Sequence, residues 1–119
     1  MREFKAVSGS ELENLKETLK RCPEGTVEAL LNYRAHGDFE SLSVFLVGCI
    51  KRHTDEEYQA CLDEGRDTVS FIDDLGIDSM TMMEVVMMVE ECLDLQIDNQ
   101  DLMNLQTIGE LNTYIKRVL

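Results

Sequence analysis

The chain has 119 residues and a formal net charge of −13 at pH 7, with 24 acidic residues against 11 Lys and Arg. This length allows one domain with its own hydrophobic core. The acidity argues against binding to nucleic acid or to an anionic membrane surface, and it favours protein partners with basic patches.

We expect neither a signal peptide nor a membrane-spanning segment. The start of the chain lacks the apolar run of a signal peptide, and its longest apolar run, residues 44–50, is too short to cross a bilayer. The cysteines lack metal-site spacing, so we expect small buried thiols rather than disulfides or zinc ligands. They are Cys22, Cys49, Cys61 and Cys92. We expect a cytoplasmic monomer without membrane insertion.

The first part of the chain predicts two short helices. Ser10 and Glu13 match a capping box, and the helix they open should end at Pro23. A second helix should start at this proline and end at His36-Gly37, because glycine is common just after a helix. The apolar residues of this predicted hairpin are Leu12, Leu15, Leu19, Cys22, Val27, Leu30 and Leu31.

The third predicted helix has two apolar stripes. Asp38 should cap it, and it should run to about His53. The main stripe repeats every three to four residues. It consists of Leu42, Phe45, Leu46, Cys49 and Ile50. Val44 and Val47 form a second stripe, so we expect the first two helices to pack there, forming one cooperative unit with the rest.

The rest of the chain alternates helices with loops, each helix opened by a polar cap. Thr54 and Glu57 predict a short helix that ends at Gly65, followed by a loop over 66–78. We expect a helix from Ser79 to Leu93, a short one capped by Asp98, and a last one opened by the Thr107–Glu110 capping box. The last helix should bury Ile108, Leu111, Ile115 and Val118. No segment alternates like a strand, so the predicted fold is all-α.

A serine follows the long loop at the start of the fifth predicted helix. Gly76 lets the backbone turn, and Asp78 is a favoured helix cap, which puts Ser79 in the first turn. The free N–H groups of a helix start favour an oxyanion. Ser79 could therefore hold a phosphodiester. A serine that serves only as a helix cap is the simpler reading of the position alone.

The segment 74–80, Asp-Leu-Gly-Ile-Asp-Ser-Met, resembles the phosphopantetheine-attachment motif of acyl carrier proteins, D-x-G-x-D-S-L. Met80 replaces the usual leucine. The likeness continues downstream and covers roughly the last 50 residues. It includes Glu84-Val85-Val86, Val89-Glu90-Glu91, Ile97, Thr107-Ile108 and Tyr114-Ile115.

This resemblance implies an acyl-carrier-like helical bundle over residues 38–119. The family pattern does not explain residues 1–37, which we expect to form an additional N-terminal helical hairpin packed on this bundle. The resemblance also implies 4'-phosphopantetheine bound covalently to Ser79, beside Asp78, with acyl groups held as thioesters for fatty acid or polyketide-type lipid biosynthesis. The expected partners are a phosphopantetheinyl transferase and acyl-processing enzymes such as ketosynthases and acyltransferases. The protein itself should catalyse nothing. An amino-acid carrier, for example for D-alanine, and an unmodified interaction module remain alternatives.

The resemblance also places a partner-binding face on the fifth helix. The positions concerned are Met80, Met83, Glu84, Met87 and Glu91, with Asp74 in the preceding loop. Residues three or four apart share a helix face, and exposed methionines can repack against different partners. The acids do not match a calcium loop, because frames starting at Asp73 or Asp94 lack the required ligands, so we expect no metal site.

Overall fold

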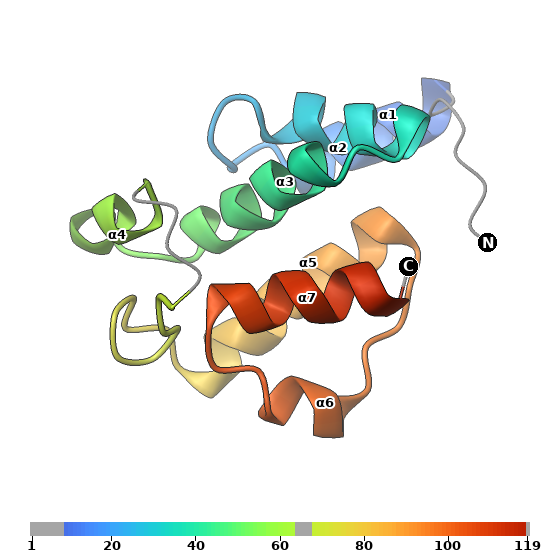
Figure 1. Cartoon of the computed structure of the whole chain (residues 1–119). Helices are drawn as coiled ribbons and strands as arrows, with labels where there is room; N and C mark the ends of the chain where they lie inside the picture. Colours follow the sequence, from blue (N-terminus) through green and yellow to red (C-terminus); the bar gives the residue numbers. More distant parts are fainter. Residues whose placement is uncertain (1–8, 64–67, 119) are drawn as a thin grey trace. The chain divides into compact units, whose positions relative to one another are not determined.

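A computed structural model describes residues 9–63 and 68–118 (Figure 1). The elements are α1 Gly9–Thr18, α2 Thr26–His36, α3 Phe39–Arg52, the 3-10 turn η1 Glu56–Tyr58, α4 Gln59–Asp63, α5 Ser79–Leu93, α6 Asn99–Met103 and α7 Ile108–Val118. The described residues contain no strand, only an isolated bridge between Ser70 and Thr107. The predicted all-α class is confirmed.

The chain divides into two compact units, Met1–Arg52 and His53–Leu119. The first contains α1, α2 and α3, and the second contains the remaining elements. This division falls after α3, whereas the sequence placed a domain boundary between residues 37 and 38. The assignment of 38–119 to the carrier domain stays a prediction.

In the first unit, side-chain contacts join α1 to α2. The Arg34 guanidinium contacts the Glu11 carboxylate at 2.6 Å. Gly37 ends α2 in the left-handed region, with φ 72°, and its N–H donates to the Tyr33 carbonyl, as expected for a glycine after a helix. The start of α2 differs from the prediction, because Gly25 is also left-handed and the helix begins at Thr26 rather than at Pro23.

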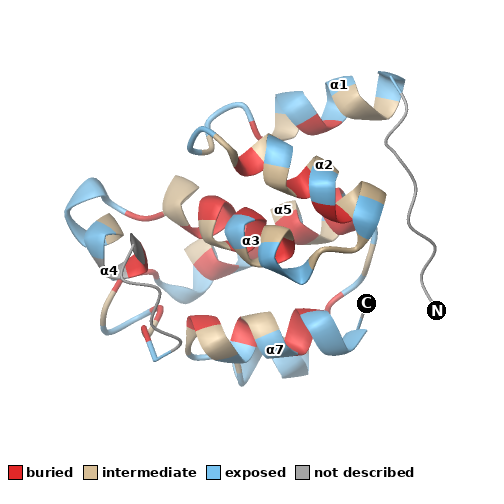
Figure 2. Cartoon of the chain, turned by 45° about the horizontal axis from the view of Figure 1, so that its top comes forward, coloured by how far each residue is buried: buried red, intermediate tan, exposed pale blue. Residues whose placement is uncertain are grey.

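Helix α2 packs closely on α3. Thr26 lies against Gly48, and Asn32 Nδ2 donates to Ser41 Oγ at 2.6 Å. The contact line on α3 therefore runs through Ser41 and Gly48. Val44 lies beside this line and is 55% exposed, so the prediction that the hairpin covers it is wrong. The main stripe is buried as predicted, and Figure 2 shows the buried positions along α3.

Polar caps begin most helices where the sequence placed them. Asp38 accepts from the Glu40 N–H, and Asp98 accepts from the Gln100 N–H. Thr107 Oγ1 accepts from the Glu110 N–H and donates to the Glu110 carboxylate, both at 3.2 Å, which confirms Thr107 as the cap and its pairing with Glu110.

Two other predicted caps are displaced. Ser10 lies one residue inside α1, and Asp55 rather than Thr54 occupies the cap position of η1. The predicted end of that short helix, Gly65, lies outside the described residues.

In the second unit, α5 and α7 supply most of the buried side chains. Helix α5 buries Met82, Val85, Val86, Val89, Cys92 and Leu93. Helix α7 buries Ile108, Leu111, Tyr114 and Ile115, whereas Val118, predicted to be buried, is exposed because it lies in the last turn. Figure 1 shows α6 in the connection from α5 to α7. Among the described helices, none has the length and apolarity that a membrane crossing requires.

Candidate functional site

The long loop before α5 is held by backbone hydrogen bonds to the connection between α6 and α7. The Phe71 N–H donates to the Gln106 carbonyl at 3.0 Å, and the Ile108 N–H donates to the Val69 carbonyl at 3.1 Å. Val69 and Phe71 are also buried. Segments far apart in sequence therefore fix the strand-like start of this loop.

The second half of the loop folds back on the first. Asp74 Oδ2 accepts from the Ser70 N–H at 2.7 Å, and the Ile77 N–H donates to the Phe71 carbonyl at 2.8 Å. Gly76 has φ 65°, a conformation that suits glycine because it has no Cβ. Leu75 and Ile77 are buried beside it. These contacts fix the place where the chain enters α5.

Ser79 is the first residue of α5, and it is exposed. Asp78 caps the helix in an extended conformation, and its Oδ1 accepts from the Thr81 N–H at 2.8 Å. This hydrogen bond holds the pKa of the Asp78 carboxyl below its usual value. The Ser79 hydroxyl thus lies at the positive end of the helix dipole, where a phosphate ester is favoured.

An apolar groove opens beside Ser79. Its volume is about 500 Å³, and residues of the long loop, the first turns of α5 and α6 line it. The apolar lining residues are Phe71, Ile72, Ile77, Met82, Met83, Leu102, Met103 and Leu105. An apolar chain attached near Ser79 could leave water by entering this groove.

The predicted partner face of α5 is exposed. Met80 is 73% exposed, and Met83, Met87, Glu84 and Glu91 are also exposed, while Met82 on the opposite side is buried. Their role in partner binding stays a prediction. Glu84 also lies near His53, with 3.5 Å between Glu84 Oε2 and His53 Nδ1. Asp74 differs from the others, because it is half-buried and its carboxylate bonds to the loop backbone.

The sequence did not identify Ile72 and Met103 as site residues. Both line the groove, and Met103 is 82% exposed. The motif does not indicate either residue, because they come close to Ser79 only when the loop folds beside α6.

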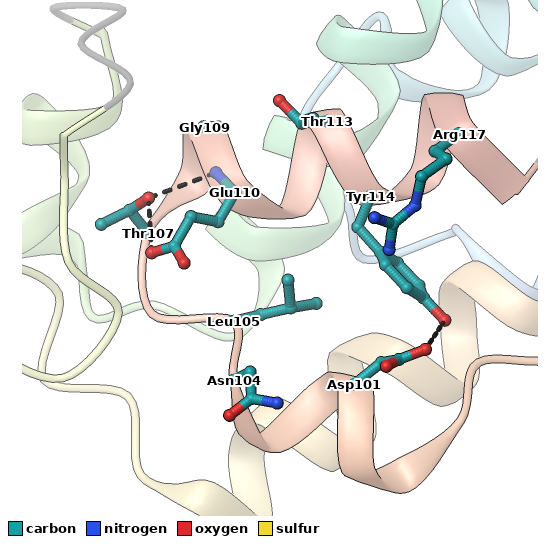
Figure 3. Close-up of a pocket in the computed structure, with 9 residues that line it drawn as sticks. All are labelled: Asp101, Asn104, Leu105, Thr107, Gly109, Glu110, Thr113, Tyr114 and Arg117. Carbon is teal, nitrogen blue, oxygen red and sulfur yellow. Dashed lines mark hydrogen bonds between the residues drawn. The ribbon is translucent and has the colours of Figure 1, made fainter.

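A second, more polar groove of about 640 Å³ lies between α6 and α7 and does not include Ser79 (Figure 3). The Tyr114 hydroxyl donates to Asp101 Oδ2 at 3.0 Å. The Arg117 guanidinium lies 5.2 Å from the centre of the Tyr114 ring, as a cation–π contact. Burial, and then the bond to Asp101, raises the pKa of Tyr114. These contacts hold α6 against α7.

Within the described ranges, no three His, Cys, Asp or Glu residues are grouped so that they could hold a metal ion. The arrangement that is present consists of an exposed hydroxyl, a helix start and an apolar groove. It provides a nucleophilic oxygen for attachment and a place for an apolar chain.

Comparison with known proteins finds one matching family and several similar proteins. The family described as "Phosphopantetheine attachment site" matches residues 60–115. An acyl carrier protein of Chlamydia felis is 43% identical over 53 residues, which cover 44% of this chain and 68% of the relative. An acyl carrier protein of Bdellovibrio bacteriovorus is 40% identical over 55 residues, covering 46% and 70%. A search of solved structures found no match.

A third relative is the meromycolate extension acyl carrier protein of Mycobacterium leprae. It is 41% identical over 49 residues, which cover 41% of this chain and 43% of the relative.

The matched region contains the long loop, Ser79 and α5 to α7 up to residue 115. Proteins of this kind bear a covalently attached 4'-phosphopantetheine and act as carriers of acyl intermediates rather than as catalysts. The site described above and these similarities agree. The chain belongs to the acyl carrier protein family.

Proposed function

We propose that this chain carries acyl groups as thioesters on a 4'-phosphopantetheine attached to Ser79 Oγ, for fatty acid or polyketide-type lipid biosynthesis. The observation that supports it best is the exposed Ser79 hydroxyl at the start of α5, held by a loop with fixed backbone contacts. The group supplies a thiol, on which an acyl chain forms a thioester.

The residues around Ser79 fit such a group. The hydroxyl is accessible for phosphodiester formation, and the helix start favours the phosphate charge. The apolar groove lined by Phe71, Ile77 and Leu102 offers a place for the arm or for its acyl chain. An apolar cargo matches this lining better than an amino acid such as D-alanine, whose charged amino group would lose its hydration there.

The names of the relatives support an acyl group as the cargo, and one name is more specific than the others. Two of them are named acyl carrier protein, and the name of the M. leprae relative adds meromycolate extension to its role. For this chain we propose only the role that these names share, that of an acyl carrier. The expectation that the cysteines are small buried thiols rather than disulfides supports a cytoplasmic location as part of the proposal.

Intact-mass measurement tests the attachment site. Apo protein incubated with coenzyme A and a phosphopantetheinyl transferase should gain the mass of one phosphopantetheine, and Ser79→Ala should gain none. Ser10→Ala, which removes an exposed hydroxyl in α1, should be modified like the wild type. Persistent modification of Ser79→Ala would place the attachment elsewhere, and an unmodified wild type would favour an unmodified interaction module.

We further propose that basic partners, the transferase and acyl-processing enzymes such as ketosynthases and acyltransferases, dock on the exposed Met–Glu face of α5. Glu91→Lys should slow modification by the transferase several-fold, because it reverses a charge beside Met87. Glu24→Lys, at an exposed acid before α2, is the control for net charge. Equal slowing by the two variants would show that the overall charge, rather than the α5 face, governs docking.

A further inference from the structure

An exposed tyrosine lies against the loop that leads into α5. Tyr58 is the last residue of η1, and it belongs to the same compact unit as the loop. A Cβ placed on Gly76 would lie 3.5 Å from Tyr58 Cε2 and 4.0 Å from its Cδ2 and Cζ, so the ring contacts this glycine. Tyr58 therefore joins η1 to the loop segment just before Ser79.

Gly76 is the outward point of this loop. Its neighbours Leu75 and Ile77 are only 2% and 3% exposed, whereas Gly76 itself is exposed. The Gly76 N–H donates to the Ile72 carbonyl at 3.2 Å. Among the described residues outside its chain neighbours, the three atoms nearest to a Gly76 Cβ all belong to Tyr58. The buried neighbours hold the inner side of the loop, and the tyrosine ring supports its outer side.

The turn that carries the tyrosine is also fixed. The Tyr58 N–H donates to the Asp55 carbonyl at 2.9 Å, and Gln59 Nε2 donates to the Thr54 carbonyl at 3.1 Å. Thr54 is itself buried. Tyr58 keeps 38% of its surface exposed, so it is not a residue of the hydrophobic core. A ring on a fixed turn can restrain a neighbouring loop through van der Waals contacts.

We propose that Tyr58 is a positioning residue for attachment at Ser79. Its ring packs on Gly76 and restrains the loop in the conformation that presents the Ser79 hydroxyl at the start of α5. The inference rests on the proposed function, because it concerns the same serine. A partner that recognises one loop conformation binds more weakly, in proportion, when that conformation is less populated. The ring supplies the restraint, and the tyrosine hydroxyl is not needed for it.

Transferase kinetics test the effect on Ser79. With coenzyme A and a phosphopantetheinyl transferase, Tyr58→Ala should raise KM for the carrier several-fold and change kcat little, because only the population of the competent loop falls. Tyr58→Phe keeps the ring and should restore wild-type kinetics. Val44→Ala is the control for the loss of an exposed apolar side chain, since Val44 lies in the other compact unit.

Nuclear magnetic resonance of the unmodified protein tests the contact itself. An aromatic ring shifts the resonances of nearby protons, so the Gly76 Hα resonances should move in Tyr58→Ala and stay near their wild-type positions in Tyr58→Phe. The Gly76 and Ile77 N–H groups should exchange with solvent several-fold faster in Tyr58→Ala. The amides of α7 should keep their exchange rates, because the variant loosens the loop and leaves the core packed.

The proposal is overturned if Tyr58→Ala leaves either KM or the Gly76 resonances unchanged. It is also overturned if Tyr58→Phe is impaired as much as Tyr58→Ala, or if the amides of α7 exchange faster to the same extent, which would make Tyr58 a general stabilising residue. Failure of the proposed function gives a different result. The wild type then stays unmodified by the transferase, while the Gly76 resonances still respond to Tyr58→Ala.

Discussion

The carboxylate of Asp78 links the motif to the helix that begins at Ser79. Its Oδ1 accepts from the Thr81 N–H, which satisfies a backbone donor that the helix itself cannot pair. The carboxylate charge also lies at the positive end of the helix dipole. This residue therefore stabilises the first turn in which the proposed attachment serine lies.

We predict a pH-dependent effect of replacing Asp78. Because folding lowers the pKa of this carboxyl, its contribution to stability is present above the unfolded pKa of about 3.9 and is lost as the pH falls through the lower folded value. Asp78→Ala should therefore lower the melting temperature at pH 7, and its difference from wild type should shrink below about pH 4. Thermal melts followed by circular dichroism would measure this.

Asp78→Asn is the matched control, because the amide oxygen can still cap the helix but cannot titrate. The melting temperatures of Asp78→Asn and Asp78→Ala should differ by the same amount at every pH. A wild-type advantage over Asp78→Ala that stays constant down to pH 3 would contradict the prediction.

The contribution of Tyr114 to stability has the opposite pH dependence to that of Asp78, because it is lost at alkaline pH. Tyr114→Phe removes the hydrogen bond to Asp101 between α6 and α7 and should lower the free energy of unfolding by about 1 kcal/mol. Folding raises the pKa of Tyr114, so its contribution is present below the unfolded pKa of about 10 and is lost as the pH rises through the folded value. Denaturation at pH 7 and at increasing alkaline pH would follow this loss. Tyr58→Phe, at an exposed tyrosine, should have a smaller effect at neutral pH.

At the scale of the elements, the contact between α2 and α3 depends on a residue without a side chain. A Cβ added to Gly48 would overlap the side chain of Thr26. Gly48→Ala should therefore destabilise the fold by about 1–3 kcal/mol, even though alanine favours helices. Chemical denaturation would measure the loss. Gly9→Ala is the control, because a Cβ there meets nothing within 4 Å. Equal stability of the two variants would mean that α2 moves away from α3 at no cost.

The sequence predicts best those elements whose boundaries depend on residues close by in the chain. Asp98 and the Thr107–Glu110 pair form bonds within a few residues, so their patterns suffice to place the start of α6 and of α7. Side-chain exposure depends on tertiary packing instead. Val44, Met103 and Val118 all fit apolar helix patterns, yet each is exposed. The spacing of apolar residues along a helix does not show where a neighbouring helix packs.

The candidate site shows the same limit. The motif led to Ser79, Asp78 and the exposed side chains of α5, because they follow one another within a single loop and helix. The groove beside Ser79 could not be predicted in this way. Its α6 residues, such as Leu102 and Met103, lie more than twenty positions further along the chain and come close only through folding.

At the scale of the whole molecule, we predict that the two compact units unfold together. Leu30 in α2 is fully buried, so Leu30→Ala should cost about 2–5 kcal/mol and should lower the melting temperature of the whole chain in one transition. Leu31→Ala, at a half-buried position, should cost less.

Hydrogen exchange provides the decisive measurement for this prediction. Helices as short as α1 and α2 are marginal alone, so protection of residues 10–36 would reflect their packing. We expect their most protected amides to exchange at the same rate as those of α5 and α7. Exchange of residues 10–36 at the rate of free peptide, with α5 protected, would identify the first two helices as a tail.

The hydrogen bonds between the long loop and residues 106–108 have a consequence for synthesis on the ribosome. During synthesis, Ser79 joins the growing chain before the residues that supply the Gln106 carbonyl and the Ile108 N–H have been added. The loop that positions the serine therefore cannot close until translation has passed these residues. A transferase that recognises the closed loop would act only on chains synthesised beyond this point, so modification at Ser79 would follow synthesis of α6 and the start of α7.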